Sequence, residues 1–285
     1  MAIICTAKRT SLLLVLCSFL GNGHAFLSNV HHAPTLATLK SLLNDETGEG
    51  DGPTRREAIQ FGALALTALI FPGTSPAPAF AAGDPKTIVI TGGNSGIGFE
   101  AAKRLASAGH TIVLPSRTLE KSKKAVDELK SIGGNPIAAE CDLTSLASIS
   151  QFSKDLPNLL GNKKIDVLCL NAGIARSTSA KDCARTKDGF ELTVGTNHFG
   201  HFALNKLLLP QLNSEGRIVV TASGVHDPES PGGAQGEKAT LGDLQGLERD
   251  GRNFEMVDGN PFNADKAYKD SKVRKWSALM QAIKA

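Results

Sequence analysis

The sequence predicts an α/β protein built on a doubly wound parallel sheet, preceded by a non-globular targeting region and expected to be truncated at its C-terminus. Three observations predict this fold. From residue 86 onward, short β-branched runs alternate with helical stretches, as in parallel strands joined by crossover helices. The run 165–170 is continuously apolar, which is typical of a strand buried on both faces. A glycine-rich turn at 92–98 connects the first strand to the first helix, where such folds bind phosphate.

The expected elements follow one another between residues 87 and 221. We expect strands at 87–90, 111–114, 136–140, 165–170 and 217–221, and helices at 97–108, 120–132, 145–156 and 190–212. The second helix is placed by the apolar positions Ala125, Val126, Leu129 and Ile132. Residues 83–285 are assigned to one domain.

The N-terminal 25 residues have the pattern of a signal peptide. Lys8 and Arg9 precede an apolar run at 12–20, and Gly23-His24-Ala25 offers small residues for cleavage. This run is too short for a transmembrane helix, which needs about 20 apolar residues. We therefore expect a cleaved signal peptide at 1–25.

Two further targeting segments are expected before the domain. Residues 26–54 hold hydroxylated residues with no acid before Asp45, which is typical of a plastid transit peptide. A paired arginine at 55–56, a modest apolar stretch and Ala79-Phe80-Ala81 then predict a twin-arginine thylakoid signal at 55–82. The alternative for this last segment is a short uncleaved anchor or a buried helix.

The succession of these segments resembles the bipartite plastid leader of algae with secondary plastids. It predicts a plastid protein located in the thylakoid lumen or in peripheral contact with the thylakoid membrane. The mature chain would begin near Ala82 or Gly83.

Charge and cysteine content exclude several classes of function. Lysine and arginine number 31 against 28 acidic residues, a net charge of +3 that is too small for a nucleic-acid-binding surface. Beyond the leader stand Cys141, Cys169 and Cys183, an odd number without metal-ligand spacing. We expect neither a disulfide framework nor a metal site, and we expect Cys141 and Cys169 to be buried near strand ends.

The glycine turn is the expected binding site for a dinucleotide. Its glycines permit a tight bend and close approach of the backbone to a pyrophosphate, and the following helix N-terminus supplies free N–H groups. Together with the strand before it and the helix after it, the turn predicts a Rossmann-type domain. The turn residues expected to bind the cofactor are Gly92, Asn94, Ser95, Gly96, Ile97 and Gly98.

The end of the second strand indicates which cofactor is preferred. Binders of NAD place an acid there for the ribose 2′-hydroxyl, whereas this chain has Ser116 and Arg117. A guanidinium suits a 2′-phosphate, so NADP(H) is expected, although Arg117 could also be a solvated loop charge. Asp142 is expected to reach the adenine amine or to cap the helix near Ser145. The expected cofactor contacts at the end of the fourth strand are Asn171, Ala172 and Gly173.

Four residues are candidates for the chemistry. Tyr268 and Lys272 stand four residues apart, which places both on one helix face. A nearby ammonium stabilises a phenolate, so the pair could act as general acid or base while the lysine also holds a nicotinamide ribose. Ser223 could hydrogen-bond a substrate carbonyl, and Asn197 could anchor a water that relays protons to the lysine. Tyr268 is the only tyrosine of the chain.

The chain resembles the short-chain dehydrogenase/reductase family from Lys86 to about Lys272. Within it, 189–202 resembles the branch of retinol dehydrogenases and protochlorophyllide reductases, and 239–247 and 267–273 resemble the light-dependent protochlorophyllide oxidoreductases of that branch. The resemblance implies reduction of a carbon–carbon double bond with NADPH and light, with hydride from the nicotinamide and a proton from Tyr268. The expected partner is thus a small molecule, either a tetrapyrrole or a carbonyl compound. The resemblance does not address the oligomeric state.

Two departures from this branch keep alternatives open. Its enzymes carry a cysteine two residues after the active-site lysine, where this chain has Arg274, and the chain ends 13 residues past Lys272. A carbonyl or retinol-type reductase and a non-catalytic NADP(H)- or pigment-binding protein therefore remain alternatives. The long segment between Ser223 and Tyr268 is expected to flank the substrate, because loops of such length are usually functional or disordered.

Overall fold

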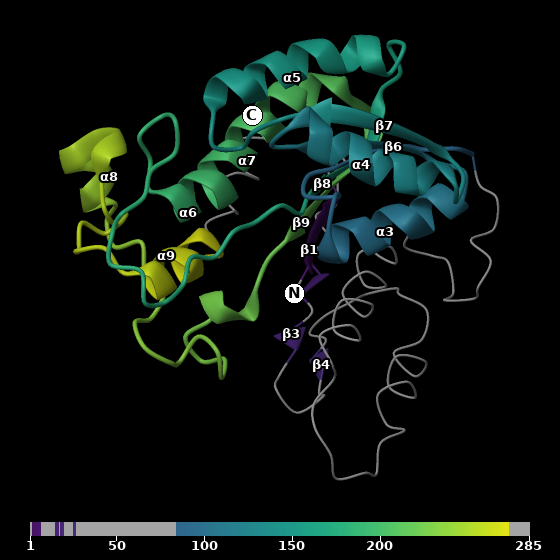
Figure 1. Cartoon of the computed structure of the whole chain (residues 1–285). Coiled ribbons are helices and arrows are strands. Elements are labelled where there is room, and N and C mark those ends of the chain that lie inside the picture. Colours follow the sequence, from purple (N-terminus) through teal and green to yellow (C-terminus); the bar gives the residue numbers. More distant parts are fainter. Residues whose placement is uncertain (1, 7–14, 17, 20–24, 27–83, 274–285) are drawn as a thin grey trace, which may run out of the picture. The chain divides into compact units, whose positions relative to one another are not determined.

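The computed structural model describes residues 2–6, 15–16, 18–19, 25–26 and 84–273 (Figure 1). Nearly all of the expected leader, as well as Arg274, lies outside these residues. The chain divides into two compact units, which we treat separately. The sheet unit comprises residues 1–140, 157–172 and 211–222, and the helical unit comprises residues 141–156, 173–210 and 223–285.

The sheet unit contains the expected parallel sheet. Five parallel strands lie in the order β7 (Asn135–Glu140), β6 (Thr111–Ser116), β5 (Thr87–Ile90), β8 (Ile165–Leu170) and β9 (Leu212–Thr221). The chain runs outward from β5 through β6 to β7 and then returns to β8 on the other side. This reversal confirms the doubly wound fold. In such folds ligands bind at the carboxyl ends of the strands beside the reversal, here β5 and β8.

Short antiparallel strands from the N-terminus extend one edge of this sheet. Strand β1 (Ala2–Thr6) pairs with β9, and β2 (Val15–Leu16) pairs with β1, while β3 (Ser18–Phe19) pairs with β4 (Ala25–Phe26) in a separate ladder. These strands lie in the expected signal peptide, apart from Phe26, which is the first residue of the expected transit peptide. Strand β9 presents backbone groups along its outer edge, which a short extended segment can satisfy.

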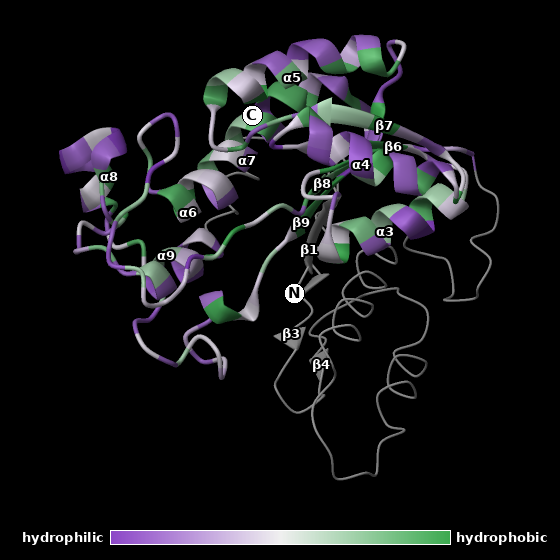
Figure 2. Ribbon diagram, viewed as in Figure 1, coloured by the Kyte–Doolittle hydropathy of each residue, from purple (hydrophilic) through white to green (hydrophobic). Residues whose placement is uncertain are grey.

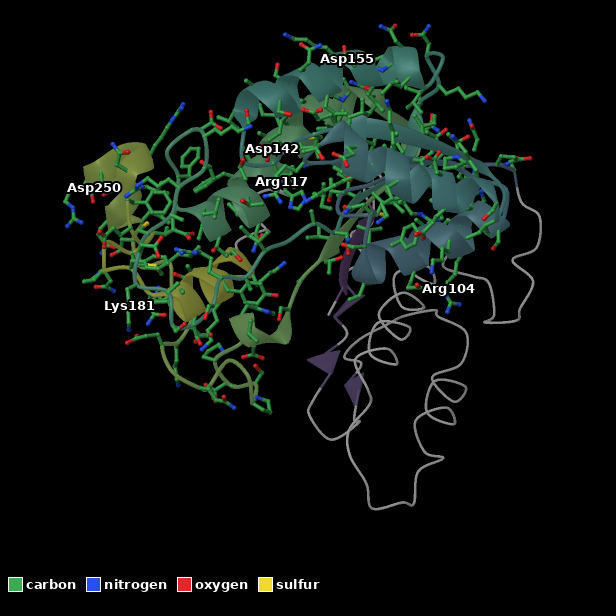
Figure 3. The ribbon with its side chains drawn as sticks, viewed as in Figure 1. Arg104, Arg117, Asp142, Asp155, Lys181 and Asp250 are labelled. Atoms are coloured by element: carbon green, nitrogen blue, oxygen red, sulfur yellow. The ribbon has the colours of Figure 1, made fainter. Side chains whose placement is uncertain are left out.

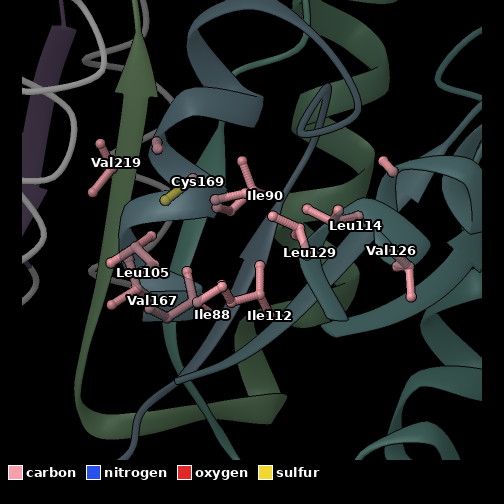
Figure 4. Close-up of a cluster of buried hydrophobic side chains, with 14 residues drawn as sticks. Ile88, Ile90, Leu105, Ile112, Leu114, Val126, Leu129, Val167, Cys169 and Val219 are labelled. Carbon is pink, nitrogen blue, oxygen red and sulfur yellow. The ribbon is translucent and has the colours of Figure 1, made fainter. Parts of the chain in front are cut away.

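One face of the sheet packs against α3 (Gly96–Ser107) and α4 (Leu119–Lys130). The core between them is a cluster of buried hydrophobic side chains from the strands and the two helices (Figures 2 and 4). Residues on the opposite face, including Val89, Val113 and Leu168, are buried too, as the apolar runs predict. Ile132 is 40% exposed, contrary to expectation, because α4 ends before it at Lys130.

The helix expected at 190–212 is interrupted and shorter. It consists of α6 (Leu192–Val194), a π-helical turn η1 (Gly195–Gly200), α7 (His201–Leu208) and the 3₁₀ turn η2 (Leu209–Gln211). Strand β9 then begins at Leu212, five residues earlier than expected at 217, since Leu212 already pairs with Ile165 of β8 before a register shift. The remaining crossover helix is α5 (Leu146–Leu159).

The segment after β9 is folded rather than an open loop. It contains η3 (Gly224–His226), α8 (Gln245–Asp250), η4 (Gly251–Asn253) and α9 (Ala264–Ser271). A small hydrophobic core holds this segment against α6. In it, the fully buried Phe254 lies with Val257 and with Val194 of α6. Among the described helices, none has the length and apolar content needed to cross a bilayer.

Candidate functional site

The glycine turn between β5 and α3 has the geometry that a pyrophosphate requires. Gly92 and Gly96 have φ angles of +64° and +55°, which side chains with a Cβ rarely adopt. A Cβ on Gly98 would lie 2.5 Å from the carbonyl oxygen of Gly92. A Cβ on Gly96 would instead point into open space, with no atom of another part of the chain within 4 Å. Ser95 is the N-cap residue of α3, but its side chain makes no capping bond. The turn therefore leaves an open cradle at a helix N-terminus.

Asn171 fixes the carboxyl ends of three strands. Its Nδ2 donates to the carbonyl of Thr91 at 3.1 Å, and its Oδ1 accepts from Thr221 Oγ1 at 3.1 Å. Thr91 Oγ1 in turn accepts from the backbone N–H groups of Asn171 and Ala172, at 2.9 and 3.0 Å. A Cβ on Gly92 would lie only 2.8 Å from Ala172 Cα, so the turn touches the end of β8. Asn171 and Ala172 thus support the cradle.

The residues expected to select the cofactor lie at the end of β6. Arg117 is exposed and follows the last residue of the strand (Figure 3), and it forms no ion pair with another described residue. Ser116 is 5% exposed, and its buried Oγ has no hydrogen-bond partner in the described part of the chain. The Arg117 guanidinium and the unpaired Ser116 hydroxyl beside it suit a ligand group that is rich in oxygen atoms, such as a phosphate.

Asp142 is engaged within the helical unit and does not cap α5. Its Oδ1 accepts from the N–H and hydroxyl of Thr144, and its Oδ2 pairs with Lys187 Nζ at 3.0 Å. Although burial acts to raise the pKa of Asp142, these hydrogen bonds hold the pKa below its ordinary value. The first turn of α5 is instead capped by Ser145, and by Asp188, which accepts from Leu146 N at 2.7 Å. The capping alternative for Asp142 was wrong, and the adenine contact stays a prediction.

Tyr268 and Lys272 lie together in the helical unit, as their spacing predicts. Tyr268 is half-buried on α9, and Lys272 is the C-cap residue of that helix. The Lys272 Nζ lies 5.6 Å from the centroid of the Tyr268 ring. Burial lowers the pKa of Lys272 to about 8. The pair therefore places a phenol beside a buried ammonium, an arrangement that suits general acid–base chemistry.

Asn197 holds this pair in place from η1. Its Nδ2 donates to the Ile174 carbonyl at 2.9 Å and to Ser271 Oγ at 3.0 Å, and its Oδ1 accepts from Ile174 N at 2.8 Å. A Cβ on Gly173 would lie 3.4 Å from Lys272 Nζ and 3.5 Å from Asn197 Oδ1. The helical unit thus brings Gly173, Asn197 and Lys272 together. A π-helical turn inside an α-helix is frequently a functional feature, and here it carries Asn197.

Ser223 lies at the start of η3, which packs against α9. Its Oγ accepts only a long bond of 3.5 Å from Val225 N. Ser223 is partly exposed, so its hydroxyl can still donate to a ligand oxygen. The expected catalytic residues therefore all belong to the helical unit, while the glycine turn and Arg117 belong to the sheet unit.

Comparison with known proteins identifies the family. The sequence model for "short chain dehydrogenase" matches residues 86–235, more than half of the chain. The protein belongs to the short-chain dehydrogenase family. This family of oxidoreductases has the Rossmann-type fold that the structure shows.

Curated relatives within the family are protochlorophyllide reductases. The chloroplastic enzyme of Chlamydomonas reinhardtii is 39% identical over 194 residues, which cover 66% of this chain and 48% of that protein. The enzyme of Daucus carota is 37% identical over 232 residues, which cover 76% and 57%. This short-chain dehydrogenase thus spans about half the length of the curated relatives that it matches.

A solved structure supports the fold alone. The alcohol dehydrogenase from the archaeon Thermococcus sibiricus, complexed with 5-hydroxy-NADP, is 21% identical, with a TM-score of 0.50. The match covers 70% of this chain and 71% of that chain.

Several buried charges of this short-chain dehydrogenase were not predicted from its sequence. Lys266, Lys269 and Asp270 are at most 4% exposed on α9, beside Tyr268. A signal was available, because Lys269 and Asp270 follow Lys266 by three and four residues, a spacing at which helical side chains are neighbours. Asp258 forms an ion pair with Lys266. This pairing could not be predicted from spacing, because Asp258 lies outside α9, eight residues before Lys266.

The described residues contain no cluster of three or more potential metal ligands. Cys141 and Cys169 are buried as expected, and burial raises the pKa of Cys141 to about 12. Such a thiol is protonated at neutral pH and is a poor nucleophile.

Proposed function

We propose that the protein is an NADPH-dependent reductase of the protochlorophyllide-reductase type. The observation that carries the proposal is the pairing of Tyr268 with the buried Lys272, held by Asn197. Support also comes from the relatives, which are named protochlorophyllide reductases.

The residues present fit NADP(H). The backbone N–H groups at the start of α3 and the glycine cradle suit the pyrophosphate, with Asn94, Ser95 and Ile97 around it. The orphan Ser116 hydroxyl and the exposed Arg117 suit the 2′-phosphate. When bound, NADPH supplies a hydride to one carbon of the substrate double bond and leaves as NADP⁺.

The protein's own residues complete the reduction. The Tyr268 hydroxyl gives its proton to the second carbon, and its O–H bond is the bond that breaks. The Lys272 ammonium stabilises the resulting phenolate, and a proton from solvent then restores the phenol. Asn197 keeps Ser271 and the backbone at Ile174 in place, so that Lys272 stays beside the phenol. The Ser223 hydroxyl hydrogen-bonds a substrate oxygen.

The substitution Tyr268→Phe tests this assignment. Loss of the proton donor should lower kcat by roughly 10²- to 10⁴-fold, because general acid catalysis contributes about that much. Affinity for NADPH, measured by nucleotide fluorescence, should stay within about twofold, since the ring remains. The assay is illumination of the purified full chain with NADPH and protochlorophyllide. Wild-type turnover that survives in Tyr268→Phe would contradict the role of Tyr268.

The two alternatives give different results in the same assay. A carbonyl or retinol-type reductase would turn over retinal in the dark and leave protochlorophyllide unchanged. A non-catalytic binding protein would bind NADPH or pigment and turn over no substrate, and Tyr268→Phe would barely change it. The sequence feature that favours this second alternative is Arg274, which stands two residues after Lys272, where the resemblance implies a cysteine.

A further inference from the structure

Helix α9 carries two lysines that are almost completely buried. Lys266 and Lys269 are 3% and 2% exposed. Lysine is rarely buried without a partner, because removing an ammonium from water costs several kcal/mol. Their partners therefore indicate what holds the helix.

Lys266 binds three oxygens from three places in the chain. Its Nζ lies 2.9 Å from Asp258 Oδ2, 2.5 Å from Asp270 Oδ2 and 2.8 Å from the carbonyl oxygen of Thr240. An ammonium has three donors, so Lys266 has none left. Asp270 also accepts from the backbone N–H of Thr240 at 2.9 Å. We call Lys266, Asp258 and Asp270 the lysine clamp.

The lysine clamp connects α9 to the segment that precedes it. Asp258 and Thr240 both belong to the long segment between Ser223 and Tyr268. Lys269 adds to the same connection, since its Nζ donates to the carbonyls of Gln235 and Glu237 and pairs with Asp265 at 2.7 Å. The backbone of this segment is therefore tied to α9 at several points.

Helix geometry places the clamp opposite the reactive pair. At about 100° per residue, Lys266 and Asp270 lie within roughly 40° of each other around α9, as do Tyr268 and Lys272. The midpoints of the two pairs are roughly 160° apart around the helix, and the nearest members, Lys266 and Lys272, are roughly 120° apart. Rotation of the helix toward or away from the clamp would therefore move the Tyr268 oxygen directly.

We propose that the lysine clamp is a positioning device, which sets the rotation of α9 and so couples Tyr268 and Lys272 to the order of segment 235–258. This inference rests on the proposed function for its consequence in catalysis. Its structural part concerns only the environment of Tyr268. The clamp residues are positioning residues, because none of them belongs to the Tyr-Lys face.

The single tyrosine allows a test that does not need turnover. Ultraviolet difference absorbance of tyrosinate in the full chain reports on Tyr268 alone, because no other tyrosine is present. We expect Asp258→Asn and Asp270→Asn each to displace the tyrosinate titration curve relative to wild type. Asp243→Asn is the matched control, since Asp243 is exposed in the same segment and outside the clamp. Its curve should coincide with that of wild type.

The kinetic part of the test is the split between kcat and KM. Each clamp variant should lower kcat by about tenfold to a hundredfold through misplacement of the phenol, with KM for NADPH unchanged. If the asparagine variants do not fold, Lys266→Arg keeps the charge and changes only the geometry, and the same curves are measured on it. Folded clamp variants whose tyrosinate curves coincide with wild type would overturn the proposal. Absence of wild-type turnover would instead refute the proposed function and leave the tyrosinate comparison valid.

Discussion

At the residue scale, the arrangement depends on one cation beside one phenol. The pKa of Lys272 is lowered to about 8 by burial, from an ordinary 10.5. Between these two pH values the unfolded chain binds more protons than the folded chain, so the free energy of unfolding rises with pH. Below pH 8 both states carry the charge, and the cost of burying it is fully present.

This difference between the folded and unfolded pKa values predicts that Lys272 contributes a gain in stability at alkaline pH. From about pH 8 to 10.5, the free energy of unfolding should gain at most ~3 kcal/mol relative to Lys272→Met. Denaturant unfolding of both proteins across this range measures the difference. Activity should move the other way, because the ammonium that stabilises the phenolate is lost. Parallel pH–stability curves for the two proteins would contradict this prediction.

Arg117 is the second single residue on which the proposal depends. Arg117→Gln should weaken NADPH binding by roughly 10- to 100-fold, because a charge-assisted hydrogen bond contributes about 1.5–3 kcal/mol. Binding of NADH, which lacks the 2′-phosphate, should be unchanged. Fluorescence titration with both nucleotides measures this. Lys121→Gln, an exposed change on α4, serves as control, and an equal loss for both nucleotides would remove Arg117 from cofactor selection.

At the element scale, the turn between β5 and α3 depends on positions that have no side chain. Two of its glycines differ in what they require. Gly98 needs room, since a Cβ there would meet Asn171 Nδ2 and the Gly92 carbonyl, each at 2.5 Å. Gly96 needs only its φ angle of +55°, because nothing lies near it.

The two alanine substitutions should therefore have different effects. Gly96→Ala should cost about 1–2 kcal/mol through backbone strain alone. Gly98→Ala should cost roughly 1–3 kcal/mol through overpacking, and should also displace Asn171 and reduce NADPH affinity. Denaturant unfolding and nucleotide fluorescence measure the two effects. Equal loss of nucleotide affinity in both variants would show that the turn does not depend on the contact with Asn171.

At the scale of the whole molecule, the N-terminal region can be either a cleaved leader or a part of the sheet, and proteolytic cleavage decides between the two. As a leader, it would deliver the protein to the thylakoid lumen and be removed near Ala82 or Gly83. In the structure, β1 from this region pairs with β9, from Ala2 opposite Thr221 to Thr6 opposite Arg217. Removal of the leader would therefore open the outer edge of β9.

We expect the protein in cells to be the chain without its leader, in a plastid, either in the thylakoid lumen or in peripheral contact with the thylakoid membrane. The proposal rests on the segment pattern at 1–82 and on relatives that are named chloroplastic. Fractionation of plastids, with mass determination of the N-terminus, measures both location and cleavage. A chain that keeps residues 1–25, or that is found only in the stroma, would contradict this assignment.

The sequence by itself determined the fold class, the glycine turn and the Tyr-Lys pair. These features are local, since periodicity, turn residues and an i,i+4 spacing depend on neighbours in the chain. Tertiary structure decided how Asn197 meets Ser271, how Asp142 is engaged with Lys187, and which charges hold α9. It also placed β9 at Leu212, and a π-helical turn at Asn197. These depend on contacts between residues distant in sequence, and burial there alters pKa values and pairings in ways that no local pattern records.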